Sequence, residues 1–183
     1  MSPATDRSLV ERARNGDLDA FEEIVRVRMD GVYRLTMAIL GDEADARDAA
    51  QETFITAWRQ IRSVRDPERF DAWLQRVAVN AARMTHRSRR RRGVREIPQS
   101  RLGGARTEPP LHDGAEADAR MLDAALRTLD IDQRSILVLH HLEGRSVAEL
   151  AAMLDVPAGT VKSRLHTARR ALQSAIDAEA SDR

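Results

Sequence analysis

The chain has 183 residues, which is enough for one medium-sized hydrophobic core or two small helical ones. Its formal net charge is only +1, so the overall charge says little about what the protein binds. The sequence has no cysteine, which excludes disulfides, thiolate chemistry and a cysteine-based zinc site. It also has no signal peptide or spanning segment, and we therefore expect a cytoplasmic protein without membrane insertion.

The first two predicted helices are each preceded by an aspartate that can cap them. Asp6 precedes a short helix that ends near Gly16, and Asp17 precedes a longer helix that ends at Gly41. Apolar residues recur at helical spacing along the longer helix and predict its buried face: Phe21, Ile24, Val25, Met29 and Val32. The chain is therefore predicted to begin with helical structure.

The third predicted helix, from about residue 43 to residue 61, is apolar on one side and acidic on the other. Its apolar side carries Ala46, Ala50, Phe54, Ala57 and Ile61. Its acidic side carries Asp45, Asp48 and Glu52, and like charges at this spacing cost an isolated helix roughly 0.2–0.5 kcal/mol per pair. The acidic side indicates a basic partner protein; a solvated face relieved by Arg47 and the helix N-terminus is an equal alternative.

A short polar loop leads to a fourth predicted helix, from about residue 71 to residue 87, with basic outer faces. Its inner side is predicted from Trp73, Leu74, Val77, Ala78 and Ala81. Its outer strip has a spacing of four, three and four residues and consists of Arg76, Asn80, Arg83 and Arg87. Arginine and asparagine bind phosphates and base edges with paired hydrogen bonds, and the arginine run at 89–92 favours phosphate attraction. This helix is predicted to bind nucleic acid.

The helical spacing stops between residues 93 and 117, where proline and glycine cluster. This composition predicts a flexible linker. Two further helices are expected at 118–129 and 132–142, the first with Leu122, Ala125, Leu126 and Leu129 facing inward. The predicted fold is therefore all-α, with two small helical domains at 1–92 and 118–183 joined by the linker 93–117.

Residues 146–172 have the pattern of a helix-turn-helix. Ser146 and Glu149 form a capping box at the start of its first helix, and Pro157 suits the start of the second, near Ala158. The second helix is predicted to bury Val161, Leu165, Ala168 and Leu172. Its exposed face is basic and free of acids, which suits the major groove of DNA; an ordinary helical hairpin with a solvated basic face is the alternative.

The sequence has no pattern typical of an enzyme. It has no phosphate-binding glycine loop, no nucleophile with a placed base and no metal-ligand cluster. Adjacent His140 and His141 are expected to point apart, which makes them a poor metal pair. We therefore expect no catalytic residue, no metal site and no cofactor.

The order of these parts resembles the extracytoplasmic-function (ECF) group of the bacterial sigma-70 family RNA polymerase sigma factors. The segment DARDAAQETFITAW at 45–58 is similar to their core-binding segment, and FDAWLQRVAVNAAR at 70–83 is similar to their minus-10 helix. The segment VPAGTVKSRLHTARRAL at 156–172 is similar to their minus-35 helix. The resemblance covers nearly the whole chain and implies sigma domain 2 at 1–92 and sigma domain 4 at 118–183.

The resemblance also implies a function and residue roles. A sigma factor binds core RNA polymerase through its beta-prime and beta subunits, recognises the minus-35 and minus-10 elements of promoter DNA, and helps to melt the DNA. The implied core polymerase-binding residues are Asp45, Asp48, Gln51 and Glu52. The implied minus-10 DNA-binding residues are Arg62, Arg65, Arg76, Asn80, Arg83 and Arg87. The implied minus-35 DNA-binding residues are Thr160, Lys162, Ser163, Arg164, His166 and Arg169.

Two positions depart from the family's pattern. Thr167 stands where relatives often have arginine, and Asp155 stands where a turn glycine is common, although aspartate tolerates a left-handed conformation. An anti-sigma factor held between the two domains is an expected partner, because members of the family are commonly inhibited in that way. The alternatives are a free-standing helix-turn-helix regulator, which would bind duplex DNA as a dimer without polymerase, and a protein-only adaptor that uses the acidic helix.

Overall fold

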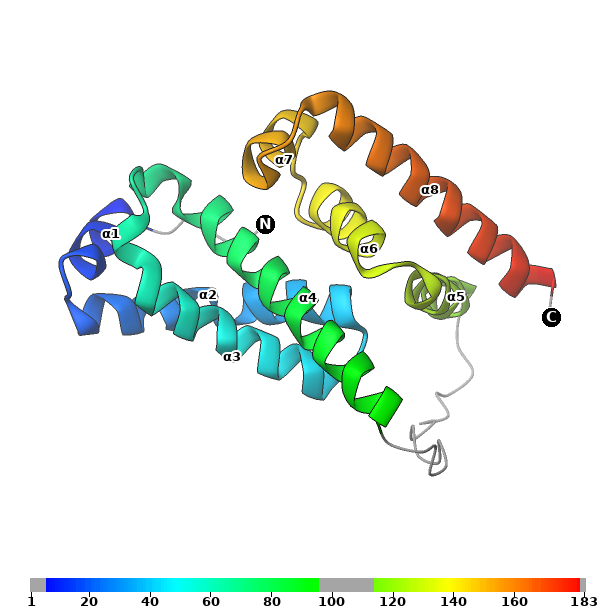
Figure 1. Ribbon diagram of the computed structural model, residues 1–183, viewed down its shortest axis with the longest axis horizontal. Coiled ribbons are helices and arrows are strands. Elements are labelled where there is room, and N and C mark those ends of the chain that lie inside the picture. Colours follow the sequence, from blue (N-terminus) through cyan, green and yellow to red (C-terminus); the bar gives the residue numbers. More distant parts are fainter. Residues whose placement is uncertain (1–5, 96–113, 182–183) are drawn as a thin grey trace.

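The structure, a computed structural model, describes residues 6–95 and 114–181, and these residues form helices and turns without strands (Figure 1). The N-terminal half contains α1 (Arg7–Arg14), α2 (Leu18–Leu40), α3 (Glu43–Gln60), the short 3-10 turns η1 (Ile61–Ser63) and η2 (Pro67–Arg69), and α4 (Phe70–Arg95). The C-terminal half contains α5 (Gly114–Thr128), α6 (Ile131–Leu137), the π-helical turn η3 (Val138–Leu142), α7 (Val147–Leu154) and α8 (Ala158–Ser181). The predicted all-α fold is confirmed.

The helix boundaries follow the capping residues. The Asp6 carboxylate accepts a hydrogen bond from the Ser8 amide, and the Asp17 carboxylate accepts one from the Ala20 amide. Gly41 ends α2 with a φ of +68°, in the left-handed region where glycine carries no steric penalty. These local signals act within a few residues of the chain, and the predictions made from them are confirmed.

In the N-terminal half, α2, α3 and α4 pack around one core, and α1 lies across one end (Figure 1). All five residues predicted to form the buried side of α3 are buried. On α2 the prediction for Met29 is wrong, because this side chain is 38% exposed while Arg28 is buried. The core-facing side of α2 includes position 28 rather than position 29. The buried Arg28 guanidinium forms an ion pair with Asp71 at the start of α4. A buried charge needs such a partner.

In the C-terminal half, α8 packs against α5, α6 and α7. The prediction for Leu122 is wrong, because this side chain is 43% exposed, whereas Ala125 of α5 and Leu129 just after the helix are buried. The second helix predicted here changes at Val138 from an α-helix to the π-helical turn η3. Helices also occupy both ends of the predicted linker, since α4 runs to Arg95 and α5 begins at Gly114; the linker prediction for 96–113 lies outside the described residues.

The two halves contact each other along α4. This helix packs against α6 and α7 of the C-terminal half, and the C-terminal end of α2 also meets α6 (Figure 1). Val79 and Ala82 of α4 are almost fully buried. Among the residues that the structure describes, no helix combines the length and apolar character needed to cross a bilayer.

Candidate polymerase and DNA interface

The acidic face of α3 is exposed at three of the four predicted polymerase-binding residues. Asp48, Gln51 and Glu52 all present their side chains to solvent. Asp42 caps the helix by accepting a hydrogen bond of 3.0 Å from the Asp45 amide. The helix is therefore well anchored at its N-terminus, and its exposed carboxylates lie on a rigid element.

Asp45 differs from the other three residues because its carboxylate is paired inside the protein. Its side chain is only 15% exposed, and its Oδ2 atom lies 2.6 Å from Nη1 of Arg89 on α4. The same Arg89 atom lies 3.1 Å from Oδ2 of Asp42. The hydrogen bond with Asp45 raises the pKa of Arg89, and the hydrogen bond from the Asp45 amide, aided by Arg89, lowers the pKa of Asp42. Arg89 thus ties α4 to the start of α3.

The acidic face continues into exposed apolar side chains that the sequence reasoning missed. Ile55 is 37% exposed and Trp58 is 39% exposed, although both are large and apolar. The Trp58 ring packs on Phe21 with a centroid distance of 4.9 Å, so its position is held by α2. Ile55 and Trp58 follow Glu52 at helical spacing, and this spacing was the available signal.

The basic strip of α4 is exposed at three of its four positions. Arg76, Asn80 and Arg87 present their side chains to solvent. Arg83 is only 22% exposed, and its Nε atom lies 2.6 Å from Oδ1 of Asp132 on α6. The guanidinium of Arg83 is therefore already paired with a carboxylate of the C-terminal half.

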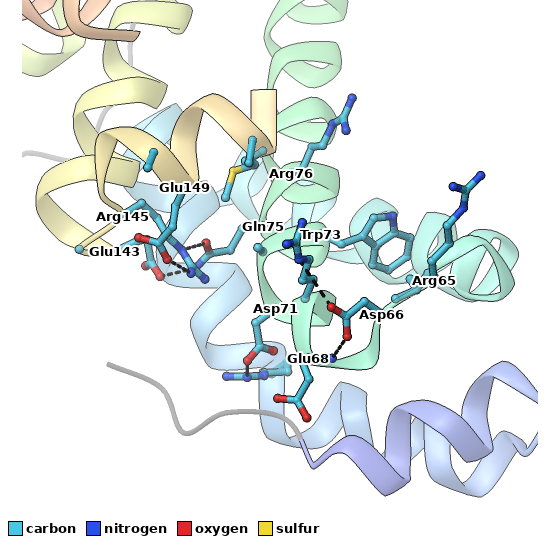
Figure 2. A pocket seen from close by; sticks show the side chains of 18 of the residues that line it. Arg65, Asp66, Glu68, Asp71, Trp73, Gln75, Arg76, Glu143, Arg145 and Glu149 are labelled. Carbon is cyan, nitrogen blue, oxygen red and sulfur yellow. Dashed lines mark hydrogen bonds and ion pairs between the residues drawn. The ribbon is translucent and has the colours of Figure 1, made fainter. Parts of the chain in front are cut away.

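The segment between α3 and α4 forms one wall of an open cleft of about 1520 Å³. Arg62 and Arg65 are exposed on this segment, and Asp66 caps η2 by accepting a hydrogen bond of 3.0 Å from the Glu68 amide. Figure 2 shows the cleft, in which Trp73 and Arg76 of α4 lie on one side and Glu143 and Arg145 lie on the other. Trp73 is half-buried, so part of its ring is open to the cleft.

The helix-turn-helix is built as the sequence predicted. In the capping box of α7, the Glu149 amide donates to the Ser146 hydroxyl at 3.2 Å, and the Ser146 amide donates to the Glu149 carboxylate at 2.9 Å. The hydrogen bond from the Ser146 amide and a second one from the Ser146 hydroxyl, helped by Arg145, lower the pKa of the Glu149 carboxyl group to about 2. Asp155 makes the turn with a φ of +54°, which confirms that aspartate takes the left-handed conformation here.

The recognition face of α8 is open along its length. Lys162, Ser163, Arg164, His166 and Arg169 are exposed, and Thr160 is half-buried. Val161, Leu165 and Ala168 are buried as predicted, whereas Leu172, also predicted to be buried, is only half-buried. Thr167, at the position that departs from the family's pattern, is also exposed.

The two adjacent histidines do not point apart, and that expectation is wrong. The rings of His140 and His141 meet edge to face with a centroid distance of 4.8 Å, in the wider π-helical turn η3. Nε2 of His141 lies 3.4 Å from Nη2 of Arg169, which connects η3 to α8. Within the described residues, no three histidine, aspartate or glutamate side chains are grouped closely enough to hold a metal ion.

An acidic and apolar helix face, a basic strip on a neighbouring helix and a helix-turn-helix on a second helical unit define the class of helix-turn-helix DNA-binding proteins. Family models agree with this geometry. The model of sigma-70 region 2 matches residues 24–92, and the model of sigma-70 region 4 matches residues 119–172.

Individual relatives give the same result over most of the chain. The RNA polymerase sigma-E factor of Streptomyces antibioticus is 35% identical over 88% of this chain and 87% of its own length. The ECF RNA polymerase sigma-E factor of Salmonella typhimurium is 33% identical over 94% of each chain. The structure of CnrH in complex with the cytosolic domain of CnrY matches 95% of this chain and 98% of that one, with 27% identity and a TM-score of 0.67.

The chain belongs to the ECF RNA polymerase sigma factors. Members of this family bind core RNA polymerase and promoter DNA. The predicted sigma-factor function is therefore confirmed over the alternative of a free-standing regulator.

Proposed function

We propose that residues 1–92 of this sigma factor bind core polymerase and open the minus-10 element, while residues 118–183 bind the minus-35 element across the linker 93–117. The observation that carries this division is that an exposed acidic face and an exposed basic recognition face lie on different halves of one chain, on α3 and α8. Opposite charge on the two faces suits opposite partners, a basic protein surface for α3 and DNA phosphates for α8.

The polymerase-binding surface combines acids with an apolar centre. Asp48, Gln51 and Glu52 supply charge and hydrogen-bonding groups, and exposed Ile55 and Trp58 supply the apolar area. Interfaces of this kind gain most of their binding energy from a few well-packed anchors, and tryptophan is prominent among these. The partner surface is assigned to the beta-prime subunit, with further contacts on beta. Asp45 supports this surface through its pairing with Arg89.

The minus-10 element is assigned to the cleft and to the α4 strip beside it. Arg62, Arg65, Arg76, Asn80 and Arg87 are the exposed members of the predicted set. Extruding a base from the duplex costs a few kcal/mol, which phosphate contacts and stacking on an aromatic ring can offset. Trp73 offers such a ring in the cleft wall. Arg83 becomes available to this set when its ion pair with Asp132 breaks.

The minus-35 element is assigned to the exposed face of α8. Phosphate contacts position a recognition helix, and side chains near its N-terminus read the base edges. Lys162, Ser163 and Arg164 lie near that end, and Thr160 lies two residues before Lys162. His166 and Arg169 lie further along the same helix.

We extend two further properties from the family to this chain. A cytoplasmic location follows from the need to meet core polymerase. An anti-sigma partner is proposed because a structural neighbour, the sigma factor RpoE of Bartonella quintana, was solved in complex with the anti-sigma factor NepR.

The function is tested by transcription from purified components. The chain is added to core polymerase on a pool of genomic promoter fragments, and the transcripts are sequenced. We expect chain-dependent start sites that share two sequence elements at constant spacing. Absence of core-dependent, sequence-specific starts would contradict the proposal, and tight duplex binding by the chain alone as a dimer on a palindrome would favour a free-standing regulator instead.

A further inference from the structure

One of the two histidines in the π-helical turn η3 contacts the recognition helix. His141 is exposed, and its Nε2 atom lies 3.4 Å from Nη2 of Arg169 on α8. Arg169 belongs to the predicted minus-35 set, whereas His141 precedes the helix-turn-helix at 146–172. A side chain from outside the motif therefore contacts one of the arginines assigned to DNA.

The chemistry of the two groups determines which atom donates. An arginine guanidinium has N–H donors and no acceptor, so Nε2 of His141 must accept the hydrogen bond with its lone pair. An imidazole that accepts at Nε2 is neutral and carries its proton on Nδ1. A protonated imidazole has N–H groups at both nitrogens and would place a donor against a donor. The contact between His141 and Arg169 therefore exists only while His141 is neutral.

The surroundings of His141 favour this neutral form. Partial burial lowers its pKa below the ordinary value of 6.5, and the nearby His140 on η3 and Arg169 on α8 lower it further. None of the described charged residues of α2, α6 or α7, which also pack against η3, contributes to this shift. Because the pKa in the folded protein is lowered, the contact is present above pH 6.5 and is lost as the pH falls through the pKa of His141.

The backbone of η3 holds the His141 ring in place. The Glu143 amide donates to the Val138 carbonyl at 3.1 Å, the five-residue hydrogen bond of a π-helical turn. The His140 ring meets the His141 ring edge to face, with a centroid distance of 4.8 Å. Nδ1 of His140 in turn lies 2.7 Å from the Arg145 carbonyl, which fixes the His140 ring beside its neighbour. His141 therefore approaches α8 from a rigid turn.

Arg169 differs from the paired arginines of α4 in the charge of its partner. Arg83 and Arg89 pair with aspartates, which orient each guanidinium but also neutralise it. Within residues 6–95 and 114–181, Arg169 makes no ion pair with a carboxylate. A neutral imidazole restricts the guanidinium, which reduces the conformational entropy lost on binding, and leaves its positive charge available to DNA. This combination suits an arginine that must bind a phosphate or a base edge.

We propose that His141 is a positioning residue for minus-35 recognition, which orients the Arg169 guanidinium toward DNA through its neutral Nε2 atom. This role rests on the proposed function, because it requires that α8 binds the minus-35 element, whereas the contact itself does not. Protonation of His141 removes the acceptor. The contribution of Arg169 to promoter affinity therefore depends on pH.

The contact is tested in the free full-length chain by NMR of the histidine side chains. We expect neutral His141 to carry its proton on Nδ1 and to titrate below an ordinary histidine. Arg169→Ala removes the donor and a positive charge, so it should raise the pKa of His141 and allow the proton to occupy Nε2. A wild-type His141 that carries its proton on Nε2, or that does not respond to Arg169→Ala, would overturn the contact.

The positioning role is tested by a double-mutant cycle on binding of the holoenzyme to a promoter. At pH 8, His141→Ala should weaken binding about two- to fivefold in the wild-type background and should have no effect in the Arg169→Ala background. The ratio of these two effects measures the coupling between the side chains. Equal effects in both backgrounds would show that His141 does not act through Arg169 and would overturn the proposal.

The neutral acceptor is tested by repeating the cycle down to pH 5. The coupling should disappear below the pKa of His141, because a general effect of the added charge on DNA binding is the same in both backgrounds. His141→Gln keeps an acceptor that does not titrate, so it should retain most of the wild-type affinity at pH 8 and its coupling at every pH. A wild-type coupling that persists unchanged at pH 5 would contradict the acceptor role.

The matched control is the same cycle with Arg170→Ala in place of Arg169→Ala. Arg170 is exposed on the same helix next to Arg169 and lies outside the predicted reading set, so it should show no coupling to His141. Thermal unfolding of each variant separates a lost contact from an unfolded domain, and His141→Gln supplies the same test if His141→Ala unfolds. Failure of the wild-type holoenzyme to bind any promoter would reject the proposed function, while the NMR data would still test the contact.

Discussion

The basic strip of α4 and the basic face of α8 have similar composition but different states in the folded protein. On α8 the side chains from Lys162 to Arg164 are exposed on a face without acids. On α4, by contrast, Arg83 is paired with Asp132 and Arg89 is paired with Asp42 and Asp45. The basic side chains of α8 are therefore accessible to DNA. On α4, Arg83 and Arg89 can bind DNA only after their ion pairs with aspartates of the protein break. This difference is why we assign duplex recognition to α8 and a polymerase-dependent step to α4.

The largest expected effect comes from a change that weakens polymerase binding, because promoter recognition by both α4 and α8 depends on that binding. Replacing Asp48 and Glu52 with lysine puts like charge against a basic partner and should weaken core polymerase binding by about 100-fold or more. Both side chains are exposed, so helicity and melting temperature should stay near wild type. Binding is measured by fluorescence titration, with Asp123→Lys plus Asp177→Lys as the charge-matched control. Loss of helicity would mean that this face has a structural role.

The directly accessible face of α8 is tested by Arg164→Ala. If Arg164 reads a base, its loss should cost about 1–3 kcal/mol on the cognate minus-35 sequence and less on other sequences. Arg170→Ala is the control, because Arg170 is exposed on the same helix but outside the predicted reading set. Competition binding of the holoenzyme to a promoter library measures both variants. Equal losses on all sequences would assign Arg164 to phosphate contact.

The difference between free and paired arginines on α4 is tested by salt dependence. Arg87→Ala should lower the slope of log affinity against log salt by about one, because an exposed arginine on a phosphate releases about one counterion. Arg89→Ala should change the slope much less, because Asp42 and Asp45 already neutralise its charge. Holoenzyme binding to a promoter between low and moderate salt measures both slopes. Equal slope changes would show that the Arg89 pairs open on DNA.

The smallest effect concerns the capping box that positions the helix-turn-helix. The pKa of Glu149 falls from its ordinary value of 4.5 to about 2, so its contribution to stability is present above pH 4.5 and is lost as the pH falls towards 2. Since the side chain is half exposed, we expect Glu149→Gln to cost at most about 1 kcal/mol at pH 7. Thermal unfolding of both proteins from pH 7 to pH 2 measures the difference, which should shrink below pH 4.5. A difference that grows as the pH falls would contradict this sign.

Several particulars of the site were predictable and several were not. The exposed faces of α3, α4 and α8 follow from helical periodicity, because the buried side of each helix fixes the opposite side. The paired states of Asp45 and Arg83 were not predictable, since nothing in the local sequence marks their partners. Exposed Ile55 and Trp58 were also missed, because large apolar residues are normally assigned to the core.

The sequence by itself determined the helices, their caps and the capping box, because these depend on contacts within four residues along the chain. The tertiary structure alone decided which of the charged side chains on the helix faces are paired within the protein. Arg89 reaches Asp45 across 44 residues, and Arg134 reaches the Ile39 carbonyl across 95 residues. Such contacts form only when helices from distant parts of the chain pack together. A periodic pattern shows which side of a helix faces outward, and the packing decides which of its charges remain available to polymerase and DNA.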